Sequence, residues 1–90
     1  MSARQHIFFQ GRVQGVGFRF TARSLAKDFT VTGFVRNLPN GEVELVAEGA
    51  AAELEGFLGA LREEMSHNIT SERVGQSVAT NEFSAFEIRY

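Results

Sequence analysis

Residues 11 to 19 read Gly-Arg-Val-Gln-Gly-Val-Gly-Phe-Arg, and the rest of the chain is arranged around this stretch. The apolar run before it, residues 7 to 9, is typical of a β-strand, and a helical pattern begins at Phe18. The stretch is therefore the end of a strand, a glycine-rich loop and the start of a helix. Such a loop can direct several backbone N–H groups toward one point beside the positive end of a helix. We expect it to hold an anion such as phosphate.

Arg19 strengthens this expectation, because a guanidinium is a planar group that can bind two phosphate oxygens together. The alternative is that the glycines mark only a tight turn and that Arg19 is a solvated side chain at a helix end. The pattern is neither the dinucleotide-binding motif Gly-x-Gly-x-x-Gly nor a Walker loop, since no Gly-Lys-Ser or Gly-Lys-Thr follows. Spacing alone leaves both interpretations open.

The length and composition of the chain predict a single domain over residues 1–90. Ninety residues can form one hydrophobic core but not two, and 43% of them are apolar, with nine phenylalanines. The lack of cysteine in the sequence excludes a disulfide framework, a thiolate nucleophile and a cysteine-ligated metal site. The fold must therefore be stabilised by packing alone.

The charge and hydropathy patterns argue against two classes of partner. The net charge of −2 disfavours nucleic acid, because proteins that bind it usually carry a surplus of Lys and Arg. The sequence contains no apolar signal region and no run of about 18 apolar residues, so we expect a cytoplasmic protein without a membrane partner. Four arginines could still form one positive face that captures a small anionic substrate: Arg12, Arg19, Arg23 and Arg36.

Periodicity in the sequence predicts two helices and five strands. Apolar residues three or four positions apart define one amphipathic helix from Phe18 to Phe29 and another over residues 50–65. The turn sequence Leu-Pro-Asn-Gly at residues 38–41 separates the second and third strands. Alternating, β-branched and aromatic residues define strands over residues 5–13, 31–37, 42–48, 70–79 and 86–90.

The order of these elements, βαββαβ followed by a short terminal strand, predicts an α+β fold of the ferredoxin-like sandwich type. In that fold an antiparallel sheet carries both helices on one face. We expect the first strand, apolar on both sides, to be central, and Val74 and Val78 to share one face of the fourth strand. The third strand alternates, and we expect Glu42, Glu44 and Glu48 on its solvated face.

Few residues are available for covalent or metal chemistry. His6 and His67 lie far apart in the sequence, so we expect both on the surface and predict no metal site. Asn37 ends the second strand, and its amide could orient a water molecule toward a phosphoryl group or simply shape the turn before Pro39. Without a general base, hydrolysis needs a weakly basic leaving group, such as the carboxylate of an acyl phosphate.

Two segments resemble the signatures of the acylphosphatase family. Residues 11–19 resemble the first signature, and residues 33–37 (Gly-Phe-Val-Arg-Asn), followed by residues 41–44 and Gly49, resemble the second. The resemblance implies a small cytoplasmic hydrolase with the ferredoxin-like fold and without a metal or cofactor. Its substrate would be an acyl phosphate, split into a carboxylate and inorganic phosphate, the latter also an inhibitor. Residues 65–72 lack the Gly-Pro that is frequent in the family, and Asn40 replaces a common aspartate.

The resemblance also assigns roles to particular residues. Arg19 would bind the phosphate through its side chain, and Asn37 would orient the attacking water. In some members of the family the C-terminal carboxylate pairs with this arginine, and Tyr90 ends the chain here. We expect a monomer, and the alternative function is a non-catalytic binding or regulatory module. The backbone amides expected to cradle the phosphate are those of Gln14, Gly15, Val16, Gly17, Phe18 and Arg19.

Overall fold

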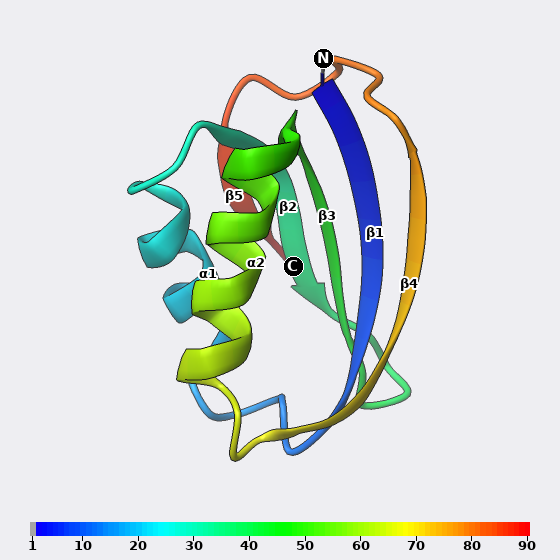
Figure 1. Ribbon diagram of the computed structural model, residues 1–90. Coiled ribbons are helices and arrows are strands. Elements are labelled where there is room, and N and C mark those ends of the chain that lie inside the picture. The colour runs from blue at the N-terminus through cyan, green and yellow to red at the C-terminus, as the bar shows by residue number, and fades with distance from the viewer. Residues whose placement is uncertain (1) are drawn as a thin grey trace.

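The computed structural model describes residues 2–90, which form two helices and a five-stranded sheet. The elements follow one another in the order β1 (Ser2–Gly11), α1 (Phe18–Ala26), β2 (Val31–Asn37), β3 (Val43–Ala50), α2 (Ala51–Glu64), β4 (Ile69–Val78) and β5 (Phe86–Arg89). Both helices cover one face of the sheet and leave the other face without a helix (Figure 1). The predicted ferredoxin-like sandwich is confirmed.

The sheet has the strand order β4-β1-β3-β2-β5, so the first strand lies inside the sheet and not at an edge, as predicted. β1 pairs antiparallel with β3 and β4, and β2 pairs antiparallel with β3. The sheet is nevertheless mixed, because β5 pairs with β2 in parallel. Figure 1 shows the cause: the segment after β4 passes over one end of the sheet to the opposite edge before β5 begins.

The hydrophobic core lies between the helices and the covered face of the sheet. Its largest fully buried side chains include Ile7 and Phe9 of β1, Phe18 of α1 and Phe57 of α2. Fully burying a side chain of this size stabilises the fold by about 1.5–3 kcal/mol. The apolar stripes of both helices therefore pack against the inward-facing residues of the interior strands. Because the chain has no disulfide, this packing must stabilise the fold.

The first helix ends earlier than the periodicity predicts. Its apolar stripe continues to Phe29, which packs partly buried against the core, but the α-helix ends at Ala26. The N–H groups of Lys27, Asp28 and Phe29 bond to carbonyl groups three residues earlier. This is the tighter pattern of a 3₁₀ turn, which satisfies the last carbonyls of the helix. The side-chain pattern thus extends beyond the regular helix.

The bounds of the first strand differ from the prediction by a few residues, and the two valines expected on one face of the fourth strand are exposed. β1 begins at Ser2 and ends at Gly11, where its register with β4 shifts, although Val13 beyond it is still buried. In β4, Val74 is 45% exposed and Val78 is 78% exposed. Val74 and Val78 are exposed because β4 forms an edge of the sheet that lies away from both helices (Figure 1).

The three glutamates of the predicted third strand do not lie on a solvated face, so that prediction was wrong; Glu42 also falls just before β3. Glu42, Glu44 and Glu48 are only 7%, 6% and 3% exposed. Long side chains from neighbouring strands cross the helix-free face and cover them, which alternation within one strand cannot reveal. Their hydrogen-bonding partners are Arg73, Gln10 and Asn40 for Glu42, Arg36 and His6 for Glu44, and Arg4, Thr80 and Asn81 for Glu48.

These contacts lower the pKa of all three carboxyl groups below the ordinary value of 4.5. Hydrogen bonds from Arg73, Gln10 and Asn40 lower the pKa of Glu42 to about 2. Burial by itself would raise the pKa of Glu44 and Glu48, but their hydrogen bonds outweigh it. A carboxyl group whose pKa is lowered on folding stabilises the protein above its unfolded pKa, and this contribution is lost as the pH falls.

We therefore predict that Glu42→Gln changes the acid sensitivity of the fold. In the unmodified protein, the contribution of Glu42 is lost as the pH falls from about 4.5 toward about 2. The variant should melt at a lower temperature at pH 7, because Arg73 loses its partner, and its melting temperature should fall less steeply over the acid range. Melting followed by circular dichroism from pH 7 to pH 2 measures both effects.

The control for this experiment is Glu63→Gln, since Glu63 is an exposed residue of α2 without an ion pair among the residues described. Its melting profile should run parallel to that of the unmodified protein. A Glu42→Gln profile that also ran parallel would contradict the assignment.

Candidate functional site

The glycine loop between β1 and α1 forms one wall of a small cavity, and the end of β2 contributes the facing residue. The loop lies at the end of the sheet opposite the N-terminus (Figure 1). The cavity has a volume of about 170 Å³. It is lined by Val13, Gly15, Gly17, Phe18, Arg19, Phe20 and Asn37. The structure thus brings Arg19 and Asn37 together, as expected, although 18 positions separate them in the sequence.

Two glycines set the path of the loop. Gly15 and Gly17 have φ angles of 74° and 78°, in the left-handed region that other residues adopt only at a cost of roughly 1–2 kcal/mol. Gly17 caps α1 without a side-chain hydrogen bond. Left-handed residues are a usual component of the backbone concavities that bind anions.

The backbone N–H groups of the loop are free to bind a ligand. Within residues 2–90, no acceptor takes a hydrogen bond from the N–H groups of residues 14–20. The first bond of the helix runs from the Thr21 N–H to the Gly17 carbonyl oxygen, at 2.9 Å. Because the helix dipole adds a partial positive charge at the same place, the electrostatics favour an anion.

Arg19 is half-buried at this cavity and forms no ion pair with the other described residues. Its guanidinium carbon lies 4.9 Å from the centre of the Tyr90 ring. The ring of Tyr90, and not its carboxylate, is therefore the part that contacts the arginine. Arg36 does not join the expected positive face, since it lies on the helix-free side and pairs with Glu44.

Asn37 presents an amide whose oxygen has no partner. Its Oδ1 atom is buried and accepts no hydrogen bond from any described residue. Leaving a buried polar atom without a partner costs about 1–3 kcal/mol, so such an atom usually has a ligand or a water molecule in the functional state. The turn-shaping role considered for Asn37 does not account for this free oxygen.

Gln14 has a role that its position in the loop did not indicate. Its side-chain nitrogen donates to the carbonyl oxygens of Leu38 and Glu42, both at 2.8 Å. These bonds tie the loop to the turn between β2 and β3. Neither Gln14 nor Val16 lines the cavity, whereas Val13 and Phe20, which we did not expect, do. The sequence does contain a sign of the role of Phe20: it is a large apolar residue that lies outside the buried stripe of its helix.

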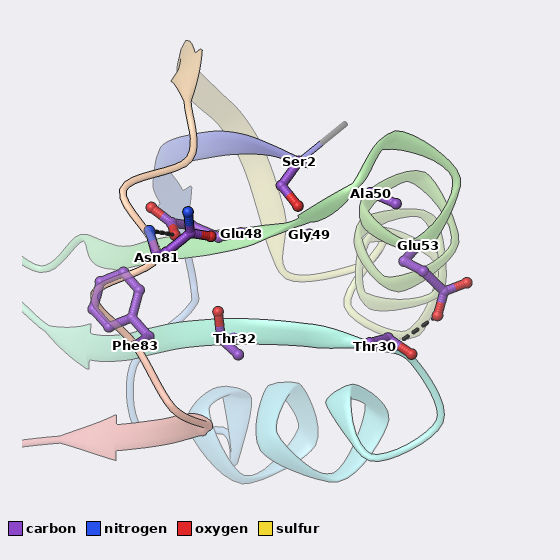
Figure 2. Close-up of a pocket in the computed structure, with 9 residues that line it drawn as sticks. All are labelled: Ser2, Thr30, Thr32, Glu48, Gly49, Ala50, Glu53, Asn81 and Phe83. Carbon is purple, nitrogen blue, oxygen red and sulfur yellow. Dashed lines mark hydrogen bonds between the residues drawn. The ribbon is translucent and has the colours of Figure 1, made fainter.

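A second cavity, of about 340 Å³, lies at the other end of the sheet. Figure 2 shows Glu48, Glu53 and Asn81 among its lining residues. The carboxylate of Glu48 already accepts hydrogen bonds from the N–H groups of Thr80 and Asn81, and Glu53 accepts one from the N–H of Thr30. Two carboxylates repel an anion, so this cavity is a poor candidate for phosphate.

Within residues 2–90 there is neither a membrane-spanning helix nor a cluster of metal-binding side chains. In the described part of the chain, no helix is long and apolar enough to cross a bilayer. The same residues contain no group of three or more histidine or acidic side chains placed to hold a metal ion. Catalysis without a metal stays a prediction of the family resemblance.

The fold and the cavity define a class of small α+β domains with a glycine-rich loop and a cavity at the start of the first helix. The family profile described as Acylphosphatase matches residues 5–88. An acylphosphatase from Syntrophus aciditrophicus is 43% identical over 91 residues, which covers 100% of this chain and 95% of that protein. An acylphosphatase from Methylococcus capsulatus is 41% identical over 86 residues, with 94% of each chain covered.

A solved structure supports the same assignment. The crystal structure of acylphosphatase from Bacillus subtilis superposes with a TM-score of 0.86 at 31% sequence identity, covering 98% of this chain and 99% of that one. The chain belongs to the acylphosphatase family, a family of hydrolases, and the resemblance seen in the sequence is confirmed.

We predict that Gly17→Ala lowers the free energy of unfolding by about 1 kcal/mol and weakens phosphate binding. A Cβ atom at Gly17 would meet no heavy atom within 4 Å, so the effect would come from the left-handed backbone alone. Urea unfolding with and without inorganic phosphate measures both quantities.

Gly59→Ala is the matched control, because Gly59 lies within α2 and a Cβ atom there also meets nothing within 4 Å. This substitution should instead stabilise the protein, by up to about 1 kcal/mol. If both alanine variants were stabilised, the backbone argument for Gly17 would be wrong.

Proposed function

We propose that the chain hydrolyses acyl phosphates at the glycine-loop cavity, giving a carboxylate and inorganic phosphate. In this proposal the backbone N–H groups of residues 14–19 and the Arg19 guanidinium hold the phosphoryl group, and Asn37 orients the attacking water. The observation that carries it is made within residues 2–90: around one cavity lie N–H groups without an acceptor, an Arg19 guanidinium without an ion pair and an Asn37 oxygen without a donor.

The reaction suits a site without an evident general base. The oxygen of water attacks phosphorus, the bond between phosphorus and the carboxylate oxygen breaks, and the bonding electrons leave with the carboxylate. This leaving group is weakly basic, so it needs no proton from the enzyme. The enzyme then has mainly to stabilise the negative charge on the phosphoryl oxygens in the transition state. Oriented N–H donors and a guanidinium can do this.

Asn37 can position the water through its free oxygen. The Oδ1 atom can accept a hydrogen bond from the water, which directs a lone pair of the water oxygen toward phosphorus. An amide does not titrate, so this orienting effect is independent of pH. The proton released from the water passes to the phosphate product or to solvent.

The remaining features of the proposal concern the protein as a whole. We propose a single domain over residues 1–90 that acts as a monomer in the cytoplasm on a small-molecule acyl phosphate, without a nucleic-acid or membrane partner. Inorganic phosphate would be both product and inhibitor, since it can occupy the same donors. The net charge of −2 supports a small anionic ligand over a polyanion.

We predict that Arg19→Ala and Asn37→Ala each lower kcat/KM for benzoyl phosphate by at least about 10²-fold, which is the size of effect expected for one preorganised contact to the transition state. Hydrolysis of benzoyl phosphate followed by absorbance measures this directly, and circular dichroism reports whether the fold is kept.

Arg12→Ala is a suitable control, because Arg12 is an exposed arginine of the same loop that does not line the cavity. Its activity should stay within about threefold of the unmodified protein. A folded Arg19→Ala or Asn37→Ala variant with full activity would contradict the role assigned to that residue. A non-catalytic module would show no hydrolysis in any of these proteins.

We further predict that inorganic phosphate raises the melting temperature of the unmodified protein and not that of Arg19→Ala. A ligand that binds only the folded state stabilises it by RT ln(1 + [L]/Kd), or roughly 1.4 kcal/mol when its concentration is ten times Kd. Melting curves at increasing phosphate, with chloride at matched ionic strength as the reference, measure the shift. Equal shifts in both proteins would mean that phosphate acts elsewhere.

A further inference from the structure

The exposed apolar side chains near the site are informative. Five large hydrophobic residues are exposed within residues 2–90, and three of them belong to the surroundings of the cavity. Val16 lies in the loop, Tyr90 contacts Arg19, and Phe20 lines the cavity itself. Phe20 is 54% exposed, although a phenylalanine gains free energy from burial. Isolated exposed apolar residues are common, but a group of them beside a charged pocket suggests a binding surface.

The size of the cavity limits what it can hold. Its volume of about 170 Å³ is below the range of roughly 300–1,000 Å³ that is usual for pockets enclosing a whole small molecule. The phosphoryl end of a substrate is the part that the loop N–H groups and Arg19 recognise. A bulky acyl group must therefore lie outside the cavity, against the residues of its rim.

Phe20 lines both the glycine-loop cavity and a neighbouring groove, which is distinct from the cavity at the other end of the sheet. That groove has a volume of about 350 Å³ and is lined by Phe20, Thr21, Ser24, Leu25 and Glu64. Phe20 is the residue common to both linings. A substrate whose phosphoryl group occupies the cavity can thus extend its acyl group across the phenylalanine ring into the groove. The Arg23 guanidinium carbon lies 5.4 Å from the centre of the Phe20 ring. The arginine therefore already covers part of the surface of the ring.

We infer that Phe20 forms the acyl-binding surface of the enzyme and gives it a preference for aromatic and bulky apolar acyl phosphates over small ones. This inference rests on the proposed function, because it assumes that the phosphoryl group occupies the glycine-loop cavity. Contact with an aromatic ring adds to affinity through apolar burial and through edge-to-face or offset stacking. A small acyl group, such as acetyl, reaches little of this surface.

The test compares kcat/KM for benzoyl phosphate and acetyl phosphate in the unmodified protein, Phe20→Ala and Phe20→Leu. The ratio of the two values should fall by about three- to tenfold in Phe20→Ala, mainly through a higher KM for benzoyl phosphate, and by less in Phe20→Leu. Val78→Ala is the matched control, since Val78 is an exposed apolar residue on the distant edge strand β4. Its ratio should equal that of the unmodified protein.

Inhibition by inorganic phosphate provides the second measurement. The inhibition constant should change by less than about twofold in Phe20→Ala, because the phosphoryl donors are kept. A ratio that stays the same in Phe20→Ala, or falls equally in Val78→Ala, would overturn the inference while the proposed function stands. An unmodified protein that cleaves neither substrate, or an active Arg19→Ala variant, would instead overturn the proposed function and the inference with it.

Discussion

The two hydrogen bonds donated by the Gln14 side chain hold the geometry of the site. They join the glycine loop, which has no regular secondary structure, to the turn that follows Asn37. Each bond contributes only about 1 kcal/mol to stability. Their effect on function is larger, because the cavity is built from two segments of the chain and exists only while those segments keep their distance. In the proposed function, the loop supplies the donors for the anion, and the strand end supplies the group that orients the water.

The scaffold beneath the site is fixed from both faces of the sheet. On the helix side, Phe9 and Phe18 pack in the apolar core with their ring centres 5.1 Å apart, and Phe18 also lines the cavity. On the other side, Glu44 and Glu48 of β3, and Glu42 just before it, bind arginines from the neighbouring strands. Ion pairs on the helix-free face therefore connect β3 to its neighbouring strands, and core packing holds the opposite face of the sheet. A site placed at the ends of such strands has little freedom to deform.

Much of this structure could be predicted from the sequence, because local pattern and global fold agree. The 3.6-residue and two-residue periodicities identify the helices and strands, and their order leaves few topologies. The pairing of Arg19 with Asn37 around one cavity also follows from that topology. The burial of Glu42, Glu44 and Glu48 could not be predicted in this way, because it depends on arginines from strands whose neighbours are known only once the sheet is formed.

Two features of the structure were not predicted, and the reason is the same for both. Gln14 was considered only for its backbone amide, yet its side chain determines where the loop lies. The parallel pairing of β5 depends on the path of the segment before it, which has no periodic signal. In both cases the deciding contact joins parts of the chain that are distant in sequence, so no short window contains the information.

The groups proposed to surround the anion are mostly backbone N–H groups, and this proposal has an evolutionary consequence. A point mutation can delete a side chain but cannot delete an N–H group, except by introducing proline. On this proposal, most residues of the loop can be substituted without loss of phosphate binding, provided that Gly15 and Gly17 keep their conformation. Selection for catalytic activity then constrains only a few side chains. A small domain of this kind can therefore diverge widely in sequence and keep its catalytic activity.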